Sequence, residues 1–202
     1  MTNIFKPTTD SLQKAADIIK KGGVIATPTD TVYGLSADIY NIEAVKRIFE
    51  IKKRPHTNPI ITLISDIKDL NKLGKTDDKI MSLANKFWPG PLTMIIERID
   101  DNDAIDFLCC GNKGISIRLP DNKIVLDIIK KSGTFIASTS ANLSGKENPL
   151  SAEEVYKQLG NTVDMIIDGG TADSNLTSTL VNMTASPPKI LREGLIPSTE
   201  IL

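Results

Sequence analysis

Residues 24–35 read Val-Ile-Ala-Thr-Pro-Thr-Asp-Thr-Val-Tyr-Gly-Leu, an apolar run followed at once by threonines, an aspartate and a tyrosine. A short apolar run between Gly22-Gly23 and a proline is typical of a buried strand. A plain loop could carry any polar residues, whereas a binding site at a strand end needs hydroxyl groups at fixed positions. We therefore expect a strand over residues 24–27 and a binding site directly after it.

Outward from this stretch, helical and strand patterns alternate along the chain. Helices are predicted over residues 10–21 (capped by Thr9 or Asp10), from Asn41 onward, and over 66–88, 121–132 and 151–159, the last with a Ser151–Glu154 capping box. Strands are predicted over residues 60–64, 92–98, 114–120, 134–140, 164–168, 178–182 and 189–193. Strands separated by helices favour parallel pairing, and the last strands follow each other closely. The expected fold is one α/β domain, residues 1–202, with a mixed sheet and flanking helices.

The composition of the 202-residue chain is that of an ordinary globular domain, with 40% hydrophobic and 24% charged residues and a formal net charge of −1. This charge gives no preference for or against nucleic acid. No apolar run approaches the roughly 18 residues of a membrane span, and the N-terminus lacks the apolar core of a signal peptide. Adjacent Cys109 and Cys110 are expected to be packing residues, which favours a reducing cytoplasm.

Several common enzyme signatures are missing from the sequence. It contains no GxxxxGK[ST], no GxGxxG after a strand, no GxSxG and no HExxH. The only histidine is His56, to which we assign no role. A Ser-His-Asp hydrolase would depend on that one residue, and no cluster suggests a zinc site.

Cations and small hydroxyl residues instead gather near the predicted strand ends. Lys52 and Arg54 follow the second helix in a loop that Pro55 and Pro59 stiffen, where they could either cap the helix dipole or bind a phosphate. The run Ser-Thr-Ser-Ala-Asn-Leu-Ser-Gly, residues 138–145, could be a turn or an anion-binding nest. Arg118 lies in a predicted strand and needs a carboxylate partner, from the protein or from a ligand. These residues predict an anion or nucleotide site.

Six segments together resemble the YrdC-like family, in order and with family-like spacing. They are PTDTVYGL (28–35), IKKRPHTNPI (51–60), SIRLP (116–120), STSANLSG (138–145), TSTLV (177–181) and ILREG (190–194). The resemblance covers about residues 10–195 and is closest to the short, single-domain members that make threonylcarbamoyl-AMP. It implies a twisted mixed sheet with a concave basic active-site face.

The resemblance also implies an activity and its site residues. L-Threonine, bicarbonate and ATP would give threonylcarbamoyl-AMP and pyrophosphate, for modification of adenosine 37 in tRNAs that read ANN codons. Mg²⁺ would be held mainly by the ATP phosphates, with no protein metal site. The product would pass to a transferase complex. The implied catalytic residues are Lys52, Arg54, Ser140 and Asn142; the threonine contacts are Thr31, Arg118, Ser138 and Ser178; the ATP contacts are Arg54, Asn58, Ser140, Asn148 and Arg192.

Two positions depart from the family pattern, and two other functions compete with this one. Leu63 stands where many relatives have a histidine, which puts one threonine contact in doubt, and Thr177 replaces the usual acidic residue. The five cations between residues 46 and 54 would also suit a module that binds double-stranded RNA or tRNA without catalysis. A carbamoyl-transfer domain like that of hydrogenase-maturation proteins is the other alternative, although the acylphosphatase and zinc-finger segments of those proteins are missing here.

Overall fold

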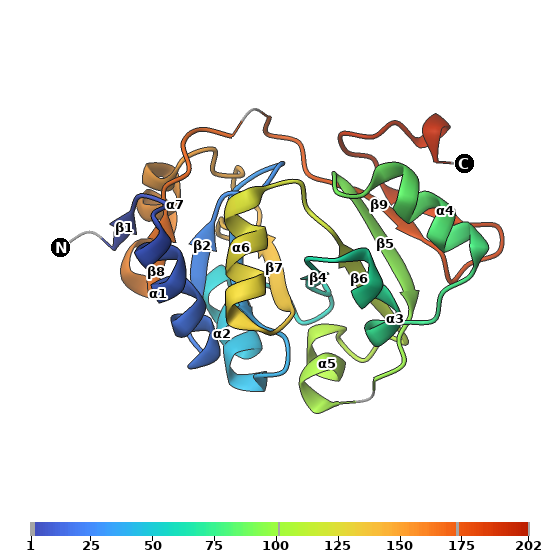
Figure 1. Ribbon diagram of the computed structural model, residues 1–202, viewed down its shortest axis with the longest axis horizontal. Coiled ribbons are helices and arrows are strands. Elements are labelled where there is room, and N and C mark those ends of the chain that lie inside the picture. The colour runs from blue at the N-terminus through green and yellow to red at the C-terminus, as the bar shows by residue number, and fades with distance from the viewer. Residues whose placement is uncertain (1–2, 101, 173, 202) are drawn as a thin grey trace.

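The computed structural model describes residues 3–100, 102–172 and 174–201. One twisted, open sheet has the strand order β1-β8-β2-β3-β7-β4-β6-β5-β9-β10 (Figure 1). Parallel pairs such as β4–β6 and β5–β9 alternate with antiparallel pairs such as β3–β7 and β5–β6, which confirms the predicted mixed α/β sheet. The strands are β1 (Ile4–Phe5), β2 (Ile25–Thr27), β3 (Gly34–Asp38), β4 (Ile61–Leu63), β5 (Leu92–Glu97), β6 (Gly114–Arg118), β7 (Ile136–Ser140), β8 (Met165–Ile167), β9 (Thr179–Asn182) and β10 (Lys189–Arg192).

Helices cover both faces of this sheet. They are α1 (Thr9–Lys20), α2 (Ile42–Lys52), α3 (Leu70–Leu73), α4 (Asp78–Phe87), α5 (Asp103–Leu108), α6 (Lys123–Ser132) and α7 (Ala152–Leu159). Figure 1 shows α1 and α6 in front of β2 and β7, and both helices contribute to one apolar cluster with Ile25 and Ile136. The buried residues of α2, α4, α5 and α7 belong to a second, larger cluster on the opposite face. Among the helices that the structure describes, none is long and apolar enough to cross a membrane.

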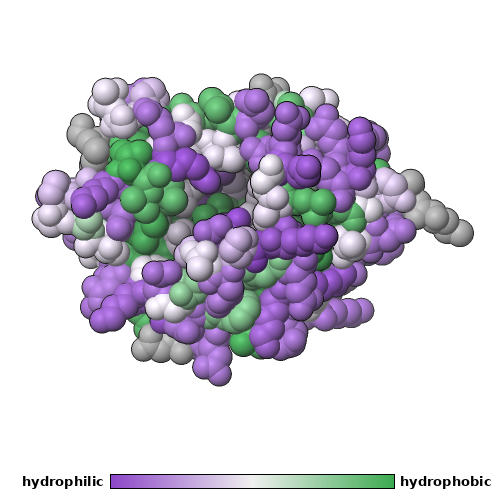
Figure 2. Space-filling view, turned by 180° about the vertical axis from the view of Figure 1, so that it is seen from behind, coloured by the Kyte–Doolittle hydropathy of each residue, from purple (hydrophilic) through white to green (hydrophobic). Residues whose placement is uncertain are grey.

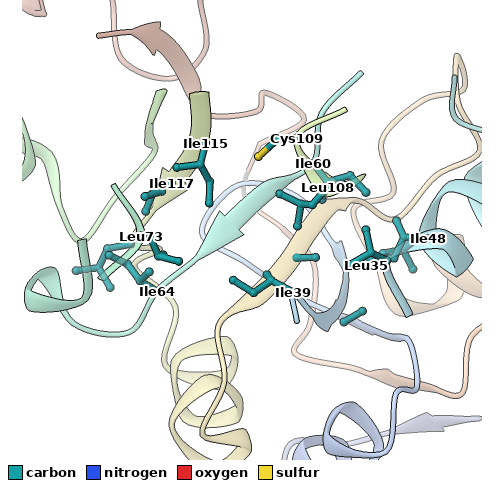
Figure 3. Close-up of a cluster of buried hydrophobic side chains, with 14 of the residues drawn as sticks. Leu35, Ile39, Ile48, Ile60, Ile64, Leu73, Leu108, Cys109, Ile115 and Ile117 are labelled. Atoms are coloured by element: carbon teal, nitrogen blue, oxygen red, sulfur yellow. The ribbon is translucent and has the colours of Figure 1, made fainter. Parts of the chain in front are cut away.

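Side chains alternate along each strand, and this alternation sets where the core ends and the site begins. On β6, Ile115 and Ile117 point into the larger cluster, where Leu108 and Ile60 also lie (Figure 3). Successive strand residues face opposite sides of a sheet, so Ser116 and Arg118 point away from that core. The sequence thus leaves a polar strip on the face that α1 and α6 cover only in part.

The adjacent cysteines have the packing role expected from the sequence. Cys109 is 1% exposed and lies among aliphatic side chains (Figure 3), and its burial raises the pKa of its thiol to about 12. Cys110 is half-buried against the same cluster, and both thiols are free.

Some predicted boundaries were wrong. The cap of α1 is Thr8 rather than Thr9 or Asp10, because the Thr8 hydroxyl accepts the Ser11 amide. The helical segments predicted over 66–88 are present as a 3₁₀ turn, α3 and α4, which are separated because Gly74 is extended and Asp77 caps a new helix. Ser151 caps α7, but Glu154 accepts from the Leu150 amide instead of closing the capping box. Strands β1 and β3 and helix α5 were not predicted from the sequence.

Candidate active site

A cavity of about 670 Å³ opens on the polar face of the sheet. Its wall uses residues of β3, β4, β5, β6, β7 and β9 and of the loops that join them. Several of its strand positions carry small residues, such as Gly34, Ser116 and Ser138. A methyl group on Gly34 would come within 2.8 Å of the Ser138 hydroxyl oxygen, so the missing side chain creates space. Figure 2, drawn from behind, shows a hollow near the middle of the molecule, bordered mostly by hydrophilic side chains.

The structure brings most of the predicted site residues to this cavity. Eight of the eleven line it: Thr31, Arg54, Asn58, Arg118, Ser138, Ser140, Ser178 and Arg192. Lys52, Asn142 and Asn148 lie outside the lining. Segments far apart in the chain therefore converge, as six strand-end motifs in one sheet should.

The opening stretch forms a tight turn between antiparallel β2 and β3. The Thr29 hydroxyl accepts the Thr31 amide at 3.1 Å, donates to the Val32 carbonyl at 2.7 Å, and lies 2.9 Å from the Thr31 hydroxyl. This local network fixes the Thr31 side chain, which is 3% exposed at the cavity wall. The hydroxyls of this stretch are thus held at set positions at the strand end, as the sequence suggested.

Arg118 reaches the same turn from the end of β6. Its Nη2 lies 2.5 Å from Asp30 Oδ1, its Nη1 donates to the Thr31 hydroxyl at 3.1 Å, and its Nε donates to the Gly90 carbonyl at 3.1 Å. A guanidinium has five N–H donors, so two remain without a bond to any described residue. The carboxylate partner that Arg118 required is the protein's own Asp30, and two donors are still available to a ligand.

Ser178 and Arg192 form the wall contributed by the C-terminal strands. The Ser178 hydroxyl lies 2.7 Å from the Thr93 hydroxyl, and Arg192 Nη2 donates to the Ser178 carbonyl at 2.9 Å. Desolvation in this wall lowers the pKa of Arg192, and the nearby charges of Arg118 and Arg54 lower it further. The guanidinium groups of Arg118 and Arg54 therefore act on that of Arg192.

Arg54 lies in the basic loop between α2 and β4. Its Nε donates to the Asn58 carbonyl at 2.8 Å and its Nη2 to the Pro59 carbonyl at 2.9 Å, so the side chain braces the loop that carries it. Burial lowers the pKa of Arg54. The described lining contains four cations, Arg54, Lys113, Arg118 and Arg192, and no carboxylate. Such a surface favours an anionic ligand.

Lys52 is 1% exposed and lies behind the cavity wall. Its ammonium donates to the carbonyls of Ser140 and Asn142, the latter at 2.7 Å, and to Asn142 Oδ1 at 3.0 Å. The Ser140 hydroxyl donates to the same Asn142 oxygen at 2.6 Å. Burial, together with the charge of Arg54, lowers the pKa of Lys52 to about 7. In this structure Lys52 and Asn142 hold the loop that presents Ser140.

Asn148 lies where two loops meet. Its amide donates to the Asn175 carbonyl at 3.2 Å, and the Ala172 amide donates to the Leu150 carbonyl at 2.8 Å. These bonds join the segment after β7 to the segment that leads into Ser178. Asn148 itself does not line the cavity.

Sequence reasoning missed several residues at the site. Asp30 belongs to the stretch quoted first, and the need of Arg118 for a carboxylate could have identified it. Asn112, Lys113 and Asn182 line the cavity from turns and strand ends that carry no recognisable pattern.

The two departures from the family pattern also lie at the cavity. Leu63 and Thr177 both line it, and Leu63 is 1% exposed and packs into the apolar cluster under α6. At this position the chain therefore offers an apolar contact, while a histidine would offer a hydrogen bond.

Comparisons with known proteins agree with this geometry. The Sua5_yciO_yrdC family model, described as telomere recombination, matches residues 17–194. The chain is 39% identical to the threonylcarbamoyl-AMP synthase of Pyrococcus abyssi, over 93% of this chain and 55% of that protein. It is 38% identical to the threonylcarbamoyl-AMP synthase of Bacillus subtilis, over 100% of this chain and 58% of that protein.

A solved structure shows the same fold. The structure of P. abyssi Sua5 complexed with L-threonine superimposes with a TM-score of 0.93 and 37% identity, over 98% of this chain and 58% of that one. The chain thus spans a little over half the length of these relatives. Because the family model matches most of the sequence, this chain belongs to the Sua5/YciO/YrdC family.

Proposed function

We propose that this protein is an L-threonylcarbamoyl-AMP synthase, which condenses L-threonine, bicarbonate and ATP into threonylcarbamoyl-AMP and pyrophosphate. One observation carries the proposal: a single cavity is lined both by the buried pair Arg118 and Thr31 and by the cations Arg54 and Arg192. The buried pair suits an amino acid and the cations suit a polyphosphate. Relatives at 38–39% identity that are named for this reaction support it.

The amino acid would bind beside Arg118 and Thr31. The two remaining N–H groups of Arg118 would bind its carboxylate in a charge-assisted hydrogen-bonded pair. The hydroxyls of Thr31, Ser138 and Ser178 are each no more than 3% exposed and line the same cavity. They would bind the polar groups of threonine, while Leu63 would contact its methyl group.

ATP would bind along the cationic side. Arg54 and Arg192 would bind phosphate oxygens, Ser140 and Asn58 would add neutral hydrogen bonds, and Asn148 would contact the nucleotide. Lys52 and Asn142 would act mainly by holding Ser140 in place, since the three bonds of the Lys52 ammonium all go to the protein. This assigns a positioning role to two residues expected to be catalytic.

The reaction would proceed in two steps within the cavity. The uncharged threonine nitrogen forms a bond to the bicarbonate carbon, with loss of water, to give an N-carboxylate. One oxygen of that carboxylate then attacks the α-phosphorus, and the bond to the bridging oxygen breaks to release pyrophosphate. Arg54 and Arg192 would stabilise the negative charge that builds on the phosphates.

Mg²⁺ would enter with ATP. The described lining offers hydroxyl and amide oxygens but no carboxylate, which fits an ion carried mainly by phosphate oxygens better than a protein-held metal. When bound, the ion would neutralise part of the phosphate charge. The residues named above would orient the two substrates.

The product would serve modification of adenosine 37 in tRNAs that read ANN codons. Because an acyl adenylate hydrolyses readily, it would pass directly to a transferase complex. The site of action would be the cytoplasm.

Direct binding of tRNA to this protein is a separate question. Of the five cations between residues 46 and 54, Lys46 pairs with Glu43 at 2.8 Å, Arg47 pairs with Asp164 at 2.6 Å, and Lys52 is buried. This disfavours the reading as an RNA-binding module.

The test is pyrophosphate release by the purified protein from ATP, with L-threonine and bicarbonate each present or omitted. We expect release that requires both and that falls sharply with L-alanine. Release that needs carbamoyl phosphate instead of threonine would favour a carbamoyl-transfer domain. No release, together with salt-sensitive binding of double-stranded RNA, would favour the RNA-binding reading.

A further inference from the structure

We propose that Lys113 is a further phosphate-binding residue of this site, on the connection between α5 and β6. The proposal rests on the proposed function, because it assigns Lys113 to the phosphates of the nucleotide. None of the sequence motifs includes this residue.

The sheet topology places Lys113 at the same end of the sheet as the basic loop. Strands β4 and β6 are parallel neighbours, with Thr62 opposite Ile117 and Leu63 opposite Arg118. The basic loop leads into β4 and the connection that carries Lys113 leads into β6, so both enter the sheet from the same end. Asn58, Arg54 and Lys113 accordingly all line the cavity. Lys113 therefore stands at the end where the phosphates would bind.

Lys113 differs from its charged neighbours in having no acidic partner. Lys75 pairs with Glu97 at 2.6 Å, and Arg98 pairs with Asp106 at 2.6 Å. Across the described parts of the chain, no carboxylate forms an ion pair with Lys113, which is exposed at the cavity. A cation that lacks an acidic partner and lines the same cavity as Arg54 and Arg192 is available to a polyanion.

The backbone that carries Lys113 is held in place. The Asn112 amide group donates to the Cys109 carbonyl at 2.7 Å, and the Cys110 amide donates to the Phe107 carbonyl at 3.0 Å. The ring of His56, in the basic loop, lies 4.1 Å from that of Phe107, and its Nε2 lies 3.0 Å from the Phe107 carbonyl. This contact ties the basic loop to α5, so less entropy is lost when the loop and the connection that carries Lys113 bind one ligand.

The charges of the cavity lining match a triphosphate. Asp30 offsets the charge of Arg118, whereas Arg54, Lys113 and Arg192 have no carboxylate partner among the described residues. Three uncompensated cations suit the phosphates of ATP better than the single charge of an amino acid. Lys113 would add a flexible point charge to the two planar guanidinium groups.

The test compares Lys113→Gln with the matched control Lys75→Gln, whose lysine is exposed and lies outside the cavity lining. ATP binding is measured by equilibrium dialysis with MgATP, and the KM values for ATP and threonine by pyrophosphate release. For Lys113→Gln we expect ATP binding about tenfold weaker, as for loss of one charge-assisted contact. In Lys113→Gln the KM for threonine should change less than about twofold. In the control Lys75→Gln the affinity for ATP should also change less than about twofold, because exposed ion pairs contribute little.

The outcomes separate this proposal from the proposed function. ATP affinity equal to wild type in Lys113→Gln would overturn the assignment of Lys113. Equal weakening by Lys75→Gln would overturn it as well, since the effect would then be long-range charge alone. A wild type that binds ATP without threonine-dependent turnover would overturn the synthase, while dialysis would still decide on Lys113. A wild type that binds no ATP would overturn both.

Discussion

Arg118 and Asp30 form a buried ion pair beside the cavity, with 2.5 Å between Nη2 and Oδ1. Their side chains are 4% and 12% exposed, and Asp30 Oδ2 has no hydrogen-bond partner in the described structure. One carboxylate oxygen therefore satisfies the charge of Arg118 and leaves two of its N–H groups for a ligand. The pair explains how a guanidinium can stay buried at the cavity wall and still bind a second carboxylate.

Removal of Asp30 should destabilise the fold. Asp30→Ala leaves a buried guanidinium without its counter-charge, and breaking a buried pair in this way costs about 3–5 kcal/mol. Urea unfolding would measure the loss. The control is Glu43→Ala, which breaks the exposed pair with Lys46 and should cost less than about 1 kcal/mol. Equal losses in the two variants would contradict a special role for the buried pair.

Gly34→Ala should block the amino-acid end of the cavity. The added methyl group would lie 2.8 Å from the Ser138 hydroxyl oxygen, closer than two such atoms approach without displacement. We expect threonine binding to weaken at least about tenfold while ATP binding is kept, with a stability cost of about 1–3 kcal/mol from overpacking. Isothermal titration with each ligand would show this. Unchanged threonine affinity would place the amino acid elsewhere.

Lys52 should make stability depend on pH. The pKa of this group is about 7 in the folded protein and 10.5 in the unfolded chain. Between these values the unfolded state binds more protons, so the free energy of unfolding rises with pH. From pH 7 to pH 10.5, the free energy of unfolding of the wild type should therefore rise relative to that of Lys52→Met by at least about 2 kcal/mol. A constant difference would mean that the pKa of Lys52 is not lowered.

Arg54→Ala should remove most turnover with the fold retained. If Arg54 stabilises charge on the phosphates, its loss should raise the barrier by about 2.7–4 kcal/mol, or roughly a factor of 100 to 1,000 in kcat. Circular dichroism would check the fold. Lys53→Gln is the matched control, because Lys53 is adjacent but lies outside the cavity lining. Wild-type activity in Arg54→Ala would contradict the proposal that Arg54 stabilises charge on the phosphates.

The sequence predicted the sheet class and most strands because their signals are local. Along residues 114–118 and 136–140, successive side chains point to opposite faces of the sheet. Asn41 caps α2 and Ser151 caps α7. β3 was missed because Gly34 and Ser36 look like loop residues, although Leu35 and Ala37 pack in the core. Its strand character comes from pairing with β2 and β7, which no local pattern reports.

The site was predicted less completely than the fold. Motif residues such as Thr31, Arg118 and Ser138 do converge, because they stand at or near strand ends of one sheet. The roles of Lys52 and Asp30 could not be read from spacing. Side-chain packing between segments about 90 residues apart decides that Arg54 and not Lys52 faces the cavity. Packing over a similar separation places the Asp30 carboxylate beside Arg118.

The most direct test of the account is to identify the product formed from L-threonine, ATP and ¹³C-bicarbonate. Mass spectrometry of the freshly quenched mixture should show threonylcarbamoyl-AMP that carries the ¹³C label, and omission of any substrate should abolish it. Arg118→Ala should lose the same product because the amino acid no longer binds. If the wild-type protein forms no labelled adenylate while it still binds ATP and threonine, the central claim is wrong.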